Sequence, residues 1–375
     1  MKLSDMAVIS AGQGAPQGES AYGTEGVPFI KAGDLASLLA GKKESEIQHV
    51  NESVAKKHRL KIYPAGSILF AKSGMSCMKG YVYKTESPCY VVSHLAIVIP
   101  TGCDGDYLKY YFQFHKPNSL VKDAAYPSIS LADIGEMEIN LQTQVEQQKI
   151  VNELEKVTEL IALRKEQLAK LDRLVKSRFI ELFGDPKYNK TNLVKIGEIG
   201  VLTSGGTPSR AKPEYFEGNI RWYSAGELNS LYLPDSVEHI SETALQQSSA
   251  KLFNKGTLMI GMYDTAAFKM GILTEDSSSN QACANLNPQQ GYNIVWLYYL
   301  FDIMKPIFLQ ERQGVRQKNL SLSKIKEFEV PVAPFELQEQ FSAFVEQVDK
   351  SKMAIQQSLD KLELLKKALM QEYFG

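Results

Sequence analysis

The sequence contains an internal repeat, and this repeat restricts the possible folds more than any other feature of the chain. Residues 168–174 match residues 359–365 at a separation of 191 positions, and the same register ends with Gly184 against Gly375. Towards the N-terminus, residues 130–138 match residues 321–329. Because the match continues through segments without helical periodicity, coincidence between two similar helices does not explain it. The sequence therefore predicts a tandem duplication in which each globular unit is followed by a long helix.

Each long segment carries one hydrophobic stripe with steps of three and four residues, which is typical of a helix that pairs with another helix. A helix from about residue 145 to residue 182 would be about 57 Å long at 1.5 Å per residue. We expect the two copies to form an antiparallel pair, with the units at opposite ends and a near two-fold axis between them. The alternative is that each helix packs only on its own unit. The stripe expected at the helix pair or a partner interface consists of Ile150, Leu154, Val157, Ile161, Leu168, Leu171, Val175, Phe341, Val345, Val348, Ile355, Leu359, Leu362 and Leu369.

The globular units contain short β-like runs separated by turn residues. Runs of this kind occupy residues 67–71, 90–93 and 96–99 in the first unit and residues 257–261 in the second. Aromatic and apolar residues recur at helical spacing in residues 106–115 and 293–309. We therefore predict an α+β fold for each unit, with a mixed or antiparallel sheet.

Composition excludes several classes of protein. Of the 375 residues, 44% are hydrophobic and 23% are charged, which is typical of a globular protein with a real core. The four cysteines form no CxxC pair and no cluster with histidine, and the five histidines lack metal-ligand spacing. No apolar run is long enough to span a bilayer. We therefore expect a cytoplasmic protein with reduced thiols, no metal, no cofactor and no membrane association.

Positive charge is concentrated locally although the net charge is only −1. Residues 55–84 contain seven Lys and Arg residues and no Asp or Glu. Such a window fits a surface that follows nucleic-acid phosphates. The alternative interpretation is an ordinary solvated face. Near the start of the second helix, the basic residues of 311–326 are balanced only by Glu311.

Motifs that would indicate catalysis are missing. The sequence has no Walker lysine loop, no GxSxG, no HExxH and no convincing GxGxxG. Residues 204–208 (SGGTP) are glycine-rich, and we predict a turn there. Residues 185–188 (DPKY) differ from the DPPY motif of amino-methyltransferases and follow Gly184, so they are interpreted as a helix exit. No catalytic residue is therefore expected.

Together these residues resemble the specificity subunits of type I restriction–modification enzymes. The opening of a target recognition domain is suggested by residues 204–209 (SGGTPS), 213–216 (PEYF), 218–222 (GNIRW) and 226–228 (GEL). Further family-like marks are residues 255–260 (KGTLMI), 280–282 (NQA), 320–325 (LSLSKI), and 179–186 (FIELFGDP) at the end of the first long helix. The first unit repeats several of them at residues 26–30 (GVPFI), 64–70 (PAGSILF) and 93–95 (SHL), but lacks the GGTPS string.

The resemblance implies a non-catalytic, DNA-reading subunit. It divides the chain into a first target recognition domain (1–140), a central conserved helix (141–184), a second target recognition domain (185–331) and a C-terminal conserved helix (332–375). Each recognition domain would read one half of a bipartite asymmetric site in double-stranded DNA. The helices would set the spacer and dock two methyltransferase subunits, and restriction subunits could join. The candidate DNA-binding residues are Lys31, Lys72, Lys79, His94, Arg210, Arg221, Lys269, Arg316 and Lys318.

Two other classes of function remain open from the sequence. A helix-mediated scaffold without a DNA role would show no salt-dependent DNA binding. A fused methyltransferase would need the cofactor loop and the motif that are missing here. A minor variant of the first interpretation is an orphan or phage-defence recognition protein.

Overall fold

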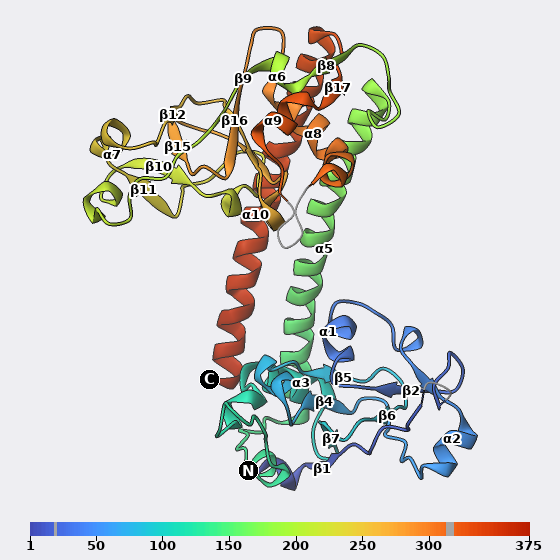
Figure 1. The fold of residues 1–375 in the computed structure, drawn as a ribbon. Helices are drawn as coiled ribbons and strands as arrows, with labels where there is room; N and C mark the ends of the chain where they lie inside the picture. The colour runs from blue at the N-terminus through green and yellow to red at the C-terminus, as the bar shows by residue number, and fades with distance from the viewer. Residues whose placement is uncertain (19–20, 313–318) are drawn as a thin grey trace. The chain divides into compact units, whose positions relative to one another are not determined.

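A computed structural model of the chain describes residues 1–18, 21–312 and 319–375 (Figure 1). Contacts between residues divide the chain into two compact units. Unit 1 consists of Met1–Arg164 and Ser358–Gly375, and unit 2 consists of Lys165–Gln357. Each unit thus combines one globular part with a piece of each long helix. These helices are α5 (Gln144–Phe183) and α10 (Phe335–Phe374).

Unit 1 is built on two small sheets. One has the strand order β1-β7-β4-β5 and is antiparallel throughout, while the other has the order β3-β2-β6 with β2 and β6 parallel. The strands are β1 (Ala7–Ala11), β2 (Val27–Ile30), β3 (His49–Val50), β4 (Ile68–Ala71), β5 (Tyr83–Lys84), β6 (Tyr90–Val91) and β7 (Leu95–Pro100). The helices are α1 (Asp34–Leu39), α2 (Glu52–Lys57), α3 (Gly105–Phe114) and α4 (Leu131–Gly135).

Unit 2 repeats this topology. Its antiparallel sheet has the order β14-β13-β16-β9, and its mixed sheet, β11-β10-β15-β12, again contains one parallel pair, β10 with β15. A two-stranded sheet, β17-β8, completes the unit. The strands are β8 (Leu193–Lys195), β9 (Gly200–Ser204), β10 (Ile220–Tyr223), β11 (Glu238–Ile240), β12 (Leu252–Phe253), β13 (Leu258–Gly261), β14 (Met270–Ile272), β15 (Ser277–Ser279), β16 (Cys283–Pro288) and β17 (Glu329–Pro331). The helices are α6 (Ile196–Ile199), α7 (Glu242–Gln247), α8 (Ile294–Phe308) and α9 (Leu322–Glu327).

Each antiparallel sheet packs against helices of its own unit, among them α3 in unit 1 and α8 in unit 2. In unit 1, Phe70 of β4 meets Phe112 of α3 with ring centroids 5.1 Å apart. In unit 2, Phe308 of α8 stacks on Phe328 at 4.6 Å and meets Phe268 at 4.7 Å. Burying each such ring contributes about 1.5–3 kcal/mol, so these aromatic clusters fix the sheet against its helix.

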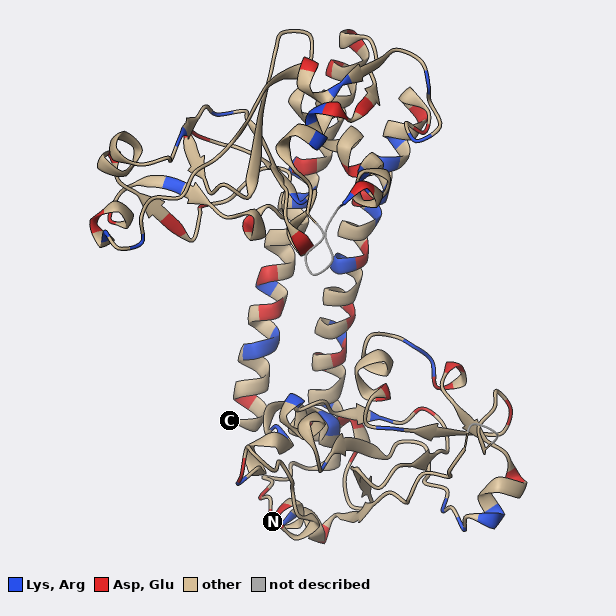
Figure 2. Cartoon of the chain, in the orientation of Figure 1, with Lys and Arg blue, Asp and Glu red and all other residues tan. Residues whose placement is uncertain are grey.

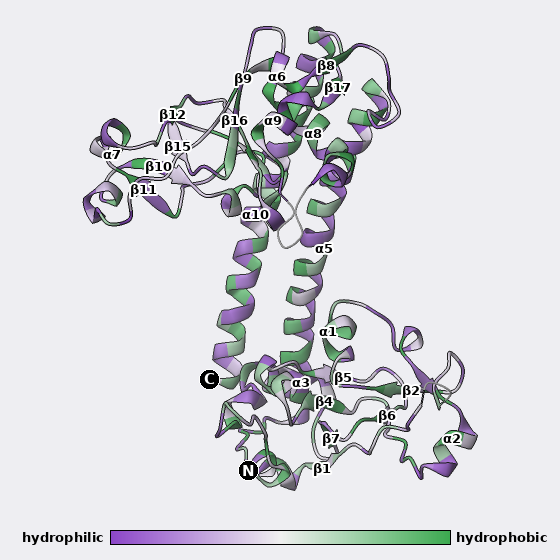
Figure 3. Cartoon of the chain, in the orientation of Figure 1, coloured by the Kyte–Doolittle hydropathy of each residue, from purple (hydrophilic) through white to green (hydrophobic). Residues whose placement is uncertain are grey.

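The long helices pair in an antiparallel manner within each unit. In unit 1, Arg164 Nε of α5 donates to Ser358 Oγ of α10 at 3.2 Å, and the hydroxyl of Tyr373 donates to the carboxylate of Glu153. The two helices therefore run in opposite directions, since residue 164 lies beside residue 358 and residue 153 beside residue 373. Hydrophobic and hydrophilic residues alternate along both helices, as expected for a pair with one shared face (Figure 3).

Unit 2 shows the same arrangement. Lys352 of α10 forms an ion pair with Asp172 of α5 at 2.6 Å, and Phe179 meets Phe341 with ring centroids 5.3 Å apart. The idea that each helix packs only on the unit it leaves is wrong, because Phe374 at the end of α10 joins the core of unit 1 beside Tyr107. The α+β fold with two antiparallel helices is confirmed.

Candidate nucleic-acid interface

In unit 1, three chain segments meet where β4 ends. Lys72 N donates to His94 O at 2.9 Å, and Lys72 O accepts from Ile129 N at 2.8 Å. Gly74 N donates to Pro127 O at 2.9 Å. These bonds hold Lys72–Gly74 between the turn before β7 and the segment before α4. We call the exposed surface of residues 72–74, 93–94 and 127–129 the β4 edge.

In unit 2, the same three segments meet where β13 ends. Met262 N donates to Ala282 O at 2.9 Å, and Leu320 N donates to Met262 O at 2.8 Å. Asp264 N donates to the Asn319 side chain at 3.0 Å. We call the surface of residues 262–264, 281–282 and 319–320 the β13 edge. The backbone framework is thus duplicated together with the fold.

The residue at which the chain leaves each edge has a positive φ. Gly74 has φ +73° with ψ 178°, a combination that glycine adopts readily, and Asp264, at the equivalent position, has φ +47°. Aspartate is one of the few residues with a side chain that tolerates a positive φ.

A fourth segment approaches each edge so closely that only glycine fits. Gly12 N donates to Leu95 O and Gly205 N donates to Cys283 O, both at 3.1 Å. A Cβ atom at Gly12 would lie 2.2 Å from Val92 O, and one at Gly205 would lie 2.3 Å from Ser279 O. The turn predicted at residues 204–208 is wrong, because Ser204 is the last residue of β9, and Gly205 and Gly206 are held by backbone bonds to Cys283 and Ser279.

The exposed side chains of the β4 edge are polar and basic. His94 Nδ1 is hydrogen-bonded to Ser73 Oγ at 2.8 Å, and the imidazole itself is exposed. Lys72 is half-buried, and Lys79, in the same loop, lies exposed with Nζ 5.9 Å from the centre of the Tyr81 ring. Tyr126, just before the edge, is 83% exposed. This surface can offer positive charge, hydrogen bonds and an aromatic ring to a ligand.

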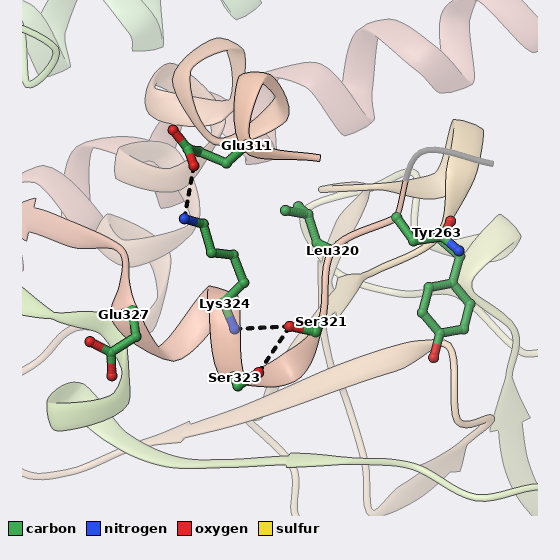
Figure 4. A pocket seen from close by; sticks show the side chains of 8 residues that line it. Tyr263, Glu311, Leu320, Ser321, Ser323, Lys324 and Glu327 are labelled. Atoms are coloured by element: carbon green, nitrogen blue, oxygen red, sulfur yellow. Dashed lines mark hydrogen bonds and ion pairs between the residues drawn. The ribbon is translucent and has the colours of Figure 1, made fainter. Parts of the chain in front are cut away.

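The β13 edge presents a different set. Tyr263 is 40% exposed, and Gln281 is exposed with its side-chain amide accepting a hydrogen bond from Thr207 Oγ1. A pocket of about 520 Å³ opens beside Tyr263 and Asn319 (Figure 4). Across it Lys324 Nζ pairs with Glu311 at 2.8 Å. Since this lysine is neutralised and Glu327 also lines the pocket, the pocket does not favour phosphate.

Two other predicted lysines lie near backbone or aromatic partners. Lys31 is half-buried, donates to Gln48 Oε1 at 2.6 Å and stands 4.1 Å from the centre of the Tyr22 ring. Lys269 is half-buried, with Nζ 3.5 Å from Gly226 O. Within residues 1–18, 21–312 and 319–375, no ion pair involves Lys31, Lys72, Lys79 or Lys269. Their charge is therefore available to an anionic partner.

Two of the three predicted arginines in unit 2 are held in ion pairs. Arg210 binds both carboxylate oxygens of Glu238, with Nη2 2.7 Å from Oε2, and lies 4.2 Å from the centre of the Phe216 ring. This hydrogen bond lowers the pKa of Glu238. Arg221 Nε lies 2.8 Å from Asp235 and 2.9 Å from Glu275. Arg316 and Lys318 lie outside the described residues.

The predicted helix stripe faces inwards. All fourteen of its side chains are buried or half-buried, with Leu154, Val175, Phe341 and Val345 having no exposed surface. Ile150 and Leu154 belong to the core of unit 1, and Val175 and Phe341 to that of unit 2. A second set of apolar side chains on the helices is exposed. It consists of Val145, Leu160, Leu163, Leu364 and Leu365 in unit 1, and of Leu174, Ile180, Phe335 and Met353 in unit 2.

The described part of the chain contains no group of three or more His, Cys, Asp or Glu side chains that could hold a metal ion. Among the same residues, no helix is long and apolar enough to cross a membrane. Lys and Arg alternate with Asp and Glu along α5 and α10 (Figure 2).

Three residues of the β13 edge were not among the predicted DNA-binding residues, namely Tyr263 and Gln281, which are exposed, and Asn319, which is half-buried. The available signal was the repeat itself, since these residues follow or precede strands that match strands of unit 1. The sequence prediction selected mainly lysines and arginines instead, because it was based on runs of basic residues.

The sequence profile described as "Type I restriction modification DNA specificity domain" matches residues 1–173 and again residues 189–364. The chain belongs to this family. Both units are thus specificity domains, in agreement with the duplicated framework of the β4 and β13 edges.

Individual relatives are more distant. The chain is 28% identical over 160 residues to the type I restriction enzyme MjaIX specificity subunit of Methanocaldococcus jannaschii, covering 41% of this chain and 37% of the relative. It is 24% identical over 182 residues to the EcoR124I/EcoR124II specificity subunit of Escherichia coli, covering 46% of this chain and 44% of the relative. The matched region therefore spans less than half the length of these curated relatives.

Solved structures support the same fold over the whole chain. The type I restriction–modification S subunit from M. genitalium has a TM-score of 0.60 at 15% identity, covering 100% of this chain and 95% of that one. A second chain, from a structure addressing complex assembly and conformational transition of the type I R-M system, also has a TM-score of 0.60, at 16% identity and with 100% and 96% coverage. At these identities the likeness concerns the fold alone.

Proposed function

We propose that this specificity domain protein recognises a bipartite, asymmetric DNA sequence, with each unit reading one half. The observation that carries the proposal is a shared backbone framework with different exposed side chains. The β4 edge presents Ser73 and His94, whereas the β13 edge presents Tyr263 and Gln281. Base edges are read by side-chain hydrogen bonds, so two like scaffolds with unlike polar groups suit two different half-sites.

Lysines beside the two edges would contact the DNA backbone. We assign phosphate contacts to Lys72 and Lys79 in unit 1 and to Lys269 in unit 2, since none of them forms an ion pair among the described residues, and Lys31 is a further candidate in unit 1. Phosphate contacts position a protein on the duplex and carry no sequence information, so a few of them suffice even at a net charge of −1. Arg210 and Arg221 are weaker candidates, because each would have to leave its carboxylate partners.

The helix pair would set the spacer between the half-sites and dock two methyltransferase subunits, which restriction subunits could join. Exposed leucines support docking, since Leu163 of α5 is 53% exposed and Leu364 of α10 is 68% exposed. These are among the apolar side chains that a docked subunit would cover. The chain itself would be non-catalytic.

The test is methylome sequencing of cells that carry the methyltransferase subunits with and without this chain. Addition of the chain should produce methylation within one bipartite motif. The purified chain alone, given S-adenosylmethionine and DNA, should transfer no methyl group. Methylation that does not depend on the chain, or turnover by the chain alone, would refute the proposal.

A further inference from the structure

The exposed Gln281 of the β13 edge is held at one end of its side-chain amide. It lies in the turn before β16, and Thr207 Oγ1 donates a hydrogen bond to its Oε1 atom. Thr207 is half-buried, whereas Gln281 is exposed. An exposed glutamine ordinarily samples several rotamers, and a fixed partner reduces the entropy that is lost when the side chain binds a ligand.

Thr207 is itself fixed by the two glycines that precede it. Gly206 N donates to Ser279 O at 2.9 Å, and Gly206 O accepts from Trp222 Nε1 at 3.0 Å. A Cβ atom at Gly206 would lie 2.0 Å from Ser249 O. The backbone at Thr207 is therefore locked against two neighbouring segments, and its hydroxyl points at Gln281 from a rigid position.

The remainder of the Gln281 amide is free to bind. Within the residues that the structure describes, Nε2 of Gln281 has no hydrogen-bond partner. A glutamine amide has two N–H donors and two acceptor lone pairs, and Thr207 occupies only one lone pair. The side chain therefore still has two N–H donors and one acceptor lone pair available to a ligand.

The β4 edge of unit 1 also carries an exposed polar side chain that is held by a hydrogen bond at one end. His94 is held through Nδ1 by Ser73 Oγ at 2.8 Å, and its exposed ring leaves Nε2 at the surface of the β4 edge. The two held side chains do not occupy equivalent positions. The bonds Leu95 N to Val92 O and Cys283 N to Asn280 O align Gln281 with Ser93 rather than with His94. Each edge thus carries one immobilised polar group of different chemistry.

We infer that Gln281 is a base-reading residue that recognises adenine in the half-site of unit 2, and that Thr207 is its positioning residue. This inference rests on the proposed function. In the major groove adenine offers an acceptor at N7 and a donor at N6, and a glutamine amide pairs with both at once. Nε2 would donate to N7, and the second lone pair of Oε1 would accept from N6.

The test compares variants of the full chain, assembled with the methyltransferase subunits, by methylome sequencing and by binding to duplexes with each base pair of the target replaced in turn. Gln281→Ala should lower discrimination for adenine at one position of one half-site by roughly 5- to 100-fold and leave the other half-site unchanged. Gln281→Glu should shift the preference at that position towards cytosine, because a carboxylate accepts from cytosine N4.

The positioning role is tested at Thr207. Thr207→Val should reduce discrimination at the same position, and Thr207→Ser, which keeps the hydroxyl, should restore it. Gln289→Ala is the matched control, because Gln289 is an exposed glutamine just beyond the opposite end of β16 and should keep the wild-type motif.

The outcomes separate the two proposals. A wild-type complex without any sequence preference would overturn the proposed function. A specific wild-type complex whose motif is unchanged in Gln281→Ala and Gln281→Glu would overturn the assignment of Gln281 alone. If Thr207→Val matches the wild type while Gln281→Ala does not, the positioning role of Thr207 is wrong.

Discussion

Single residues at the β4 edge divide into those that hold the backbone and those that face solvent. Gly12 allows a close backbone approach that a Cβ atom would prevent, and the main chain of Lys72 joins two neighbouring segments. The Lys72 side chain and Lys79 carry charge without an acidic partner among the described residues. Substitution of these two lysines should therefore affect ligand binding and leave the framework intact.

The first prediction concerns Lys72 and Lys79. Replacement of either by Ala should weaken binding of the complex to all duplexes alike and lower the slope of log K against log salt by about one, because one phosphate contact is lost. Fluorescence anisotropy across a salt series measures both quantities. Lys56→Ala is the control, since Lys56 belongs to the same basic window but pairs with Glu52 on α2. Wild-type affinity and slope in both variants would place the DNA elsewhere.

A second residue-scale prediction concerns stability. Burial disfavours the charged form of Asp106, but hydrogen bonds and positive charge from Lys109 and Lys84 outweigh this effect and lower its pKa below the ordinary value. Because of this lowered pKa, the ionised carboxylate stabilises the fold at pH values above its pKa in the unfolded state, which is near 4. This contribution is lost as the pH falls through the pKa of the carboxyl in the folded state. Asp106→Asn should lower the free energy of unfolding by about 1–2 kcal/mol at pH 7.

The same variant should flatten the acid dependence. Between pH 5 and pH 2, the free energy of unfolding of Asp106→Asn should fall less steeply than that of the wild type, because this carboxylate no longer takes up a proton on unfolding. Urea denaturation at several pH values measures both effects. An unchanged slope below pH 5 would show that the lysines do not stabilise the ionised carboxylate.

At the scale of elements, sequence periodicity was most informative for the long helices. The helix expected over residues 145–182 is α5 at Gln144–Phe183, because a stripe sustained over ten turns leaves little ambiguity. The segment at Gly205 and Gly206 was misjudged as a turn. Its conformation depends on bonds to Ser279 and Cys283, some 75 residues away, and no local pattern reports such bonds.

The element-scale prediction tests the spacer role of the helices. Insertion of one heptad after Leu168 and one after Leu359 should lengthen the unread gap by roughly three base pairs and leave both half-sites unchanged. Seven residues add about 10 Å of helix, and a heptad preserves the phase of the buried stripe. Methylome sequencing of the variant reports the gap directly. A changed half-site with an unchanged gap would refute the spacer role.

At the scale of the whole molecule, the duplication could be predicted from sequence, and the ion pairs could not. Arg210 and Arg221 were chosen for their charge, but Glu238 and Glu275, which neutralise them, come from distant strands and loops. Thr207 likewise meets Gln281 across 74 residues of sequence. Residue type identifies what chemistry is possible, while the fold decides which side chains remain available for a partner.

The two units are proposed to read DNA independently of each other. The most direct test is methylome sequencing with a chimera in which residues 1–140 are replaced by the corresponding segment of another family member and unit 2 is unchanged. The duplicated framework predicts that one half-site changes to that of the donor, while the other half-site and the gap remain. A motif in which both halves change would contradict the claim.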